Sequence, residues 1–97
     1  TALSDALQSA INRGIPVGGT SAGMAVMGEY IYTALNNSVT PTEALRNPYN
    51  SYMTFGTGFL TVPNMHKIIT ETHFYQRDRM GRMIAFLARM VKDNYTT

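Results

Sequence analysis

The most informative stretch of this chain is Gly19-Thr20-Ser21-Ala22-Gly23. It follows a short apolar run at 15–18 and opens a run of small residues. A Gly-x-Ser-x-Gly sequence between a strand and a helix is typical of a nucleophile elbow, a sharp turn that presents the serine hydroxyl. The pattern predicts Ser21 as a nucleophile and the N–H of Ala22 as an oxyanion donor. A glycine-rich turn without chemistry is the alternative interpretation.

An elbow of this kind usually sits in a parallel sheet that helices cover on both faces. The runs at 15–18, 58–62 and 67–71 are strand candidates, enough for only about two strand–helix–strand units. The chain also starts directly in a helical pattern, without an initiating Met. We therefore expect an α/β fold in which residues 1–97 form one partial domain, the interior or C-terminal part of a larger one.

Helical patterns surround these candidate strands. Apolar residues at helical spacing predict a helix over 3–13, with Gly14 as its stop. A second helix is expected from the elbow to about Leu35. The run Thr40-Pro41-Thr42-Glu43 resembles a capping box that starts a short helix before Asn47. A loop is expected over 49–58, followed later by a helix over 75–91 whose apolar stripe is Met80, Met83, Ile84, Leu87, Met90 and Val91.

Composition excludes several classes of function. The 97 residues are 44% hydrophobic, which is typical of a globular chain, and they include no cysteine for a disulfide or a thiolate metal site. The net charge of +2 is too small to indicate nucleic-acid binding. No apolar run approaches the roughly 20 residues of a membrane span. We expect neither a metal nor any other cofactor. We also expect that the N-terminus of the protein is missing from this sequence. Among the possible locations, the cytoplasm is favoured.

A nucleophilic serine needs a base, and the chain has two histidines. His66 precedes the candidate strand at 67–71, and His73 follows it. Functional groups in open α/β sheets gather at the carboxyl ends of strands. This rule favours His73 as the base, although either histidine can be an ordinary surface imidazole.

Charged residues surround His73. Arg77, Arg79 and Arg82 follow it by four, six and nine residues and can hold a substrate carboxylate through paired hydrogen bonds. Glu71 lies two residues before His73, so in an extended segment both side chains share a face. Glu71 can orient the histidine or bind a cationic group. A solvated helix face and an exposed strand end are the alternatives.

Two motifs together are similar to those of the cyanophycinase branch of serine peptidase family S51. The first motif is residues 18–23, and the second is His73-Phe74-Tyr75-Gln76-Arg77-Asp78-Arg79-Met80-Gly81-Arg82. The resemblance spans nearly the whole chain. It implies a flavodoxin-like parallel sheet with flanking helices, like that of class I glutamine amidotransferases. It also implies Ser21 as nucleophile, His73 as base, and a substrate pocket shaped by Glu71, Thr72, Arg77, Arg79 and Arg82.

The resemblance further implies a substrate and an incomplete site. Relatives cleave cyanophycin, a polyaspartate that carries arginine side chains, into β-aspartyl-arginine dipeptides. The pair before the histidine is usually Asp-Gln in that family and is Glu71-Thr72 here. The family's acid is a Glu beyond the last helix, so we expect it after Thr97 and not at Asp93. Another aspartyl dipeptidase, an esterase-like hydrolase and a truncated, non-catalytic homologue are the alternatives, and a homodimer is one expected state.

Overall fold

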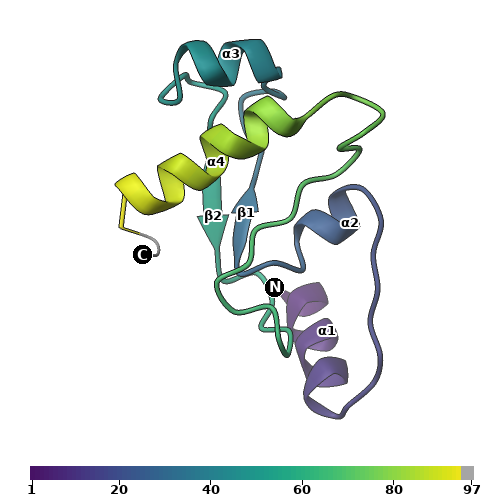
Figure 1. Ribbon diagram of the computed structural model, residues 1–97. Helices are drawn as coiled ribbons and strands as arrows, with labels where there is room; N and C mark the ends of the chain where they lie inside the picture. Colours follow the sequence, from purple (N-terminus) through teal and green to yellow (C-terminus); the bar gives the residue numbers. More distant parts are fainter. Residues whose placement is uncertain (95–97) are drawn as a thin grey trace. The chain divides into compact units, whose positions relative to one another are not determined.

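The computed structural model describes residues 1–94, which divide into two compact units. The first unit contains residues 1–31 and 56–72, and the second contains residues 32–55 and 73–94. Figure 1 shows the elements in chain order. They are α1 (Ala2–Asn12), α2 (Ala22–Ala25), β1 (Tyr30–Tyr32), α3 (Pro41–Arg46), β2 (Phe55–Thr57) and α4 (Met80–Lys92). Each unit is described by itself. That residues 1–97 form one partial domain stays a prediction.

The first helix, α1, confirms the prediction of a helix over 3–13. Thr1 caps it through the N–H of Ser4, and Gly14 follows with a φ of 79°. Inside the first unit, the Gln8 side chain anchors a distant loop, because it accepts a hydrogen bond from the N–H of Thr61 at 2.7 Å and donates one to the Thr61 carbonyl at 2.9 Å. These bonds attach the loop before His66 to α1.

The second helix, α2, is much shorter than predicted. It ends at Ala25, and the residues expected to continue it to about Leu35 form β1 instead. Two features explain the difference. Aromatic and β-branched residues such as those of β1 favour strands. In addition, the backbone at Gly28 approaches the Ile68 carbonyl so closely that a Cβ would lie 2.7 Å from its oxygen. Such close backbone approach is typical of a glycine between extended segments and not of one inside a helix.

The sheet has two strands, β1 and β2, and they are antiparallel. Parallel pairing occurs at one isolated bridge among residues 1–94, between Tyr30 and Ile69. A small α/β architecture is confirmed, with an antiparallel sheet in the described residues, whereas the flavodoxin-like parallel sheet stays a prediction. The predicted strands at 15–18 and 58–62 do not form, and β2 lies inside the predicted loop over 49–58. A strand needs a partner for its backbone hydrogen bonds, and no described strand pairs with either run.

The second unit has an aromatic core. Tyr32, Phe55 and Phe86 pack together, with ring centroids 4.6 Å apart for Tyr32 and Phe86 and 5.5 Å apart for Phe55 and Phe86. Helix α3 packs against α4 in the same unit (Figure 1). The start of α3 confirms the predicted capping box, because Thr40 and Glu43 each accept the other's backbone N–H.

The last helix, α4, begins five residues later than predicted and turns a different face inward. Its buried residues are Arg82, Ala85, Phe86 and Met90. Most of the predicted apolar stripe is exposed instead, namely Met80, Ile84, Leu87 and Val91. Phe86 sets this orientation, because an aromatic side chain buries a large apolar area when it joins other rings. None of the helices in residues 1–94 is long and apolar enough to cross a membrane.

Candidate active site

Ser21 has the backbone conformation that a nucleophile elbow requires. It is exposed and precedes α2 directly, with φ 52° and ψ −125°. Serine rarely adopts a positive φ, and such strain at a single residue tends to occur at functional sites. The Ser21 side chain makes no capping hydrogen bond to α2. The turn therefore directs the side chain away from the usual capping role.

The two glycines of the elbow have different reasons to be there. A Cβ added to Gly19 would lie 2.5 Å from the carbonyl carbon of Gly23 and 2.9 Å from the nitrogen of Met24, with the Gly23 oxygen closer still. A Cβ on Gly23 would meet nothing within 4 Å. Only the first glycine is thus required by close backbone approach, and it allows the turn to close on the start of α2.

His73 begins the second chain segment of the second unit, whereas Ser21 belongs to the first unit. Its φ of 52° is also positive, a conformation in which His is enriched relative to most residues. The carbonyls of His73 and Phe74 accept hydrogen bonds from the N–H groups of Arg77 at 3.0 Å and Arg79 at 2.9 Å. The segment that follows His73 is therefore a series of turns and not the predicted helical start.

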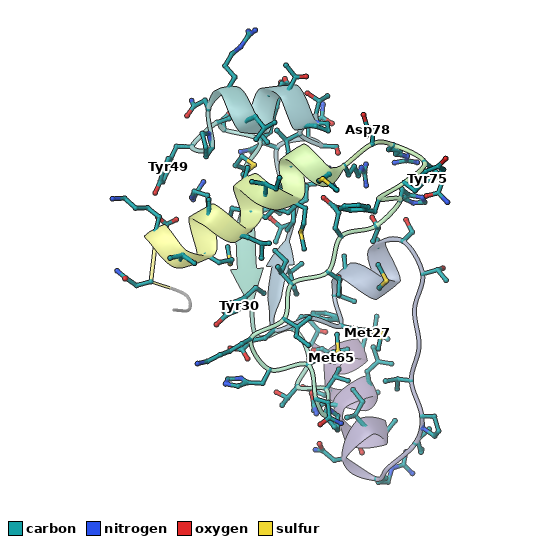
Figure 2. The ribbon with its side chains drawn as sticks, viewed as in Figure 1. Met27, Tyr30, Tyr49, Met65, Tyr75 and Asp78 are labelled. Atoms are coloured by element: carbon teal, nitrogen blue, oxygen red, sulfur yellow. The ribbon has the colours of Figure 1, made fainter. Side chains whose placement is uncertain are left out.

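The three arginines after His73 differ in exposure. Arg77 is exposed, on the same turn segment as Tyr75 and Asp78, which Figure 2 labels. Arg79 and Arg82 are buried, at 8% and 3% exposure. The alternative interpretation, in which all three arginines lie on a solvated helix face, therefore does not describe Arg79 and Arg82.

Arg82 has a structural role within the second unit. Its Nη1 donates to the Val39 carbonyl and to the Ser38 hydroxyl, both at 3.1 Å. Its guanidinium also lies 4.9 Å from the ring centroid of Tyr32 and 5.3 Å from that of Phe86. These contacts join α4 to the segment before α3. A role of Arg82 toward substrate stays a prediction.

Glu71 and Thr72 are half-buried at the end of the first unit. The N–H of Thr72 donates to Glu71 Oε1 at 3.0 Å, so the carboxylate folds back onto its own backbone. Their predicted role beside substrate is not tested by this contact. This hydrogen bond holds the Glu71 carboxylate close to the backbone of Thr72.

Glu29 and His66 form a pair that sequence patterns miss. His66 Nδ1 contacts the Glu29 carboxylate, which also accepts the N–H of Lys67 at 2.9 Å. The Lys67 hydrogen bond, with smaller contributions from His66, lowers the pKa of Glu29 despite partial burial. The two residues are far apart in the chain and no local motif joins them, so only the fold reveals the pair.

Asp93 is held by neighbours in the second unit, and its exclusion as the catalytic acid stays a prediction. It accepts a hydrogen bond from the Tyr49 hydroxyl at 2.6 Å and one from Arg89 Nε at 2.8 Å. These two bonds lower the pKa of Asp93. Arg89 also donates to the Pro48 carbonyl at 2.6 Å, so Asp93 belongs to a cluster that ties the end of α4 to the segment after α3.

Metal ligands do not gather in the described part of the chain. No group of three or more His, Asp or Glu side chains in residues 1–94 could hold a metal ion.

The fold and the elbow define the class: an α/β chain with a serine on a strained turn before a helix. Comparisons with known proteins are more specific. Cyanophycinases from Trichormus variabilis and from a Nostoc species are each 34% identical to this chain over 74 residues, 76% of the chain. The cyanophycinase of Geminocystis herdmanii is 30% identical over 89 residues, 91% of the chain. No family model matches, and no solved structure matches.

The chain is therefore cyanophycinase-like, as its two motifs predict. It spans only 22% to 29% of the length of these relatives.

Proposed function

We propose that Ser21 is the nucleophile and His73 the base of a serine-type peptidase that hydrolyses aspartyl peptide bonds. The observation that carries the proposal is the backbone of Ser21, at φ 52° and ψ −125° directly before α2. In hydrolases with a nucleophile elbow, a serine in a strained turn directly precedes a helix, as Ser21 does here. The names of the similar proteins support cyanophycin as substrate. Its cleavage to β-aspartyl-arginine dipeptides is part of the proposal.

The proposed reaction uses an acyl-enzyme. His73 takes the proton of the Ser21 hydroxyl as Oγ attacks the carbonyl carbon of an aspartyl residue. The N–H of Ala22 donates to the resulting oxyanion. The protonated His73 then gives its proton to the leaving amine. A water molecule, deprotonated by His73, releases the aspartyl product from Ser21. The acid that orients His73 is proposed to follow Thr97, outside the described residues.

The side chains near His73 suggest how the substrate is held. Arg77 is exposed, so we propose that it contacts substrate carboxylates directly. Glu71 is the proposed partner of a substrate guanidinium, and Thr72 lies beside it. Arg79 and Arg82 are also proposed to shape the substrate pocket, and Arg82 in addition holds α4 to Ser38 and Val39.

The whole protein is proposed to contain a flavodoxin-like parallel sheet. The parallel bridge between Tyr30 and Ile69 supports this proposal, because it aligns the strand after the elbow with the segment before His73. Pairing of the 15–18 run would then need a neighbouring parallel strand from elsewhere in the protein. A structure of the full chain tests this directly.

The function is tested by assaying the full chain on cyanophycin and on aspartyl dipeptides. Ser21→Ala and His73→Ala should each reduce turnover by about a thousandfold or more, whereas Ser9→Ala on the exposed face of α1 should not change it. Cleavage of dipeptides but not of cyanophycin would support the dipeptidase alternative. Unchanged turnover in Ser21→Ala would overturn the mechanism, and a folded full chain without activity would favour a non-catalytic homologue.

A further inference from the structure

The first unit contains a pocket of about 260 Å³ that involves neither Ser21 nor the residues after Thr70. Its apolar wall consists of Met27, Leu60, Val62 and Met65. Figure 2 labels Met27 and Met65, which lie next to each other. Its charged wall is Glu29, with His66 beside it. The pocket thus combines a mainly apolar surface with one carboxylate, the composition of many small-molecule sites.

The Glu29 carboxylate is held in place as an anion. The N–H of Lys67 donates to it at 2.9 Å, His66 Nδ1 contacts it, and a hydrogen bond from Tyr30 adds to the effect that lowers its pKa. His66 is 76% exposed in its side chain, so it can turn toward solvent and leave its place beside the carboxylate to a ligand. A fixed negative charge against apolar walls favours a cation with an apolar body.

Backbone contacts build the walls before any ligand arrives. The two hydrogen bonds between Gln8 and Thr61 fix the 58–62 side to α1. The N–H of Glu29 donates to the Met65 carbonyl at 3.3 Å, which fixes the opposite side. A pre-organised pocket loses less conformational entropy on binding.

We propose that this pocket binds a small organic cation in which a planar amidinium or guanidinium group is attached to an apolar body, with Glu29 as its anionic partner. The planar fork of such a cation matches a carboxylate through two parallel hydrogen bonds. Its apolar part replaces water against the Met27 and Met65 side of the pocket. The proposal does not depend on hydrolysis at Ser21.

The test is a titration of the full chain with benzamidine, a planar cation on an apolar ring, followed by calorimetry. Benzamide, which has nearly the same shape without the charge, is the matched ligand control. Benzamidine should bind with one-to-one stoichiometry, and Glu29→Gln should weaken it about tenfold or more through loss of a charge-assisted contact. Asp5→Asn, which removes a carboxylate of α1 that does not line the pocket, should leave the affinity unchanged.

Methionine methyl resonances locate the bound ligand. In the full chain with labelled methyl groups, benzamidine should shift the signals of Met27 and Met65 and leave that of Met80 in place. Val62→Phe, which fills the pocket and keeps Glu29, should also abolish binding, so the result does not rest on one variant. Equal affinity for benzamide, or loss of binding in Glu71→Gln but not in Glu29→Gln, would overturn the proposal.

Discussion

At the scale of single residues, Ser21 combines a strained backbone with an exposed side chain. A residue other than glycine held in such a sparsely populated region costs about 1–3 kcal/mol and persists only where its surroundings enforce it. Gly19, two residues before Ser21, allows the turn to close on the start of α2. The same conformation directs the Ser21 side chain away from capping α2, which fits a residue whose hydroxyl has another use.

Replacing Ser21 with two residues that lack the hydroxyl separates strain from chemistry. Ser21→Gly should be more stable than Ser21→Ala by about 1 kcal/mol, because glycine adopts a φ of 52° without a steric penalty. Urea unfolding of the two variants of the full chain measures the difference. If Ser21→Ala were the more stable variant, the backbone at Ser21 would not be strained.

The two elbow glycines provide a matched pair. Gly19→Ala should destabilise the chain by about 1–3 kcal/mol, since its Cβ would press against the backbone of Gly23 and Met24. Gly23→Ala adds a methyl group in open space and should be neutral or stabilising by up to about 1 kcal/mol. Denaturation midpoints of both variants test this, and equal losses would contradict the close approach at Gly19.

At the scale of elements, the capping box of α3 shows which structures local sequence can predict. Thr40→Ala removes the oxygen that accepts the N–H of Glu43 at 3.2 Å and should cost about 1 kcal/mol. Thr42→Ala is the control. Thr42 is the exposed second residue of the same helix, so its replacement should change stability little. Thermal unfolding compares them, and an equal cost in both variants would argue against a specific cap.

Helix α4 shows where local sequence fails. Its sequence has apolar residues on two faces, so helical spacing alone cannot say which face is buried. The predicted stripe from Met80 to Val91 lies mainly on one face, and the structure buries the other face, which contains Phe86. The choice depends on Tyr32 and Phe55, which lie far from α4 in the chain and supply the rings that Phe86 meets.

At the scale of the whole molecule, the Asp93 cluster makes stability depend on pH. The pKa of Asp93 is lowered by its bonds to Tyr49 and Arg89, so the native state binds a proton less readily than the unfolded state. The resulting stabilisation is present above the ordinary value of 3.8 and is lost as the pH falls through the lowered pKa.

The predicted consequence is a pH-dependent gap between the wild-type chain and Asp93→Asn. The wild type should be more stable at neutral pH, and the gap should shrink as the pH falls below 3.8 and through the lowered pKa of Asp93, as urea midpoints across that range can show. Tyr49→Phe keeps the carboxylate and removes one of its donors, so its acid-induced loss should begin at higher pH than in the wild type. A gap independent of pH would contradict the role of the Asp93 charge.

The two motifs of the candidate site were open to prediction from sequence, whereas the roles of their residues stay predictions. The elbow and the segment from His73 to Arg82 are contiguous motifs whose chemistry depends on neighbouring residues, and the comparisons confirm the cyanophycinase-like resemblance they carry. The burial of Arg79 and Arg82 was not predictable, because it depends on α4 turning its Phe86 face inward. The Glu29 and His66 pair was missed because its members share no local pattern.

The sequence by itself determined the elements that rest on local interactions. These are α1 with its glycine stop, the capped start of α3 and the glycine-rich turn that carries Ser21. Backbone capping and glycine's access to positive φ act between residues a few positions apart, so they can be recognised in a linear pattern.

The tertiary structure alone decided where α2 ends, which residues form β1 and β2, and which face of α4 is buried. It also decided that the 15–18 run does not form a strand. Each of these depends on residues far away in the chain. Strand pairing and apolar burial join residues that are distant in sequence, so a local pattern cannot predict them.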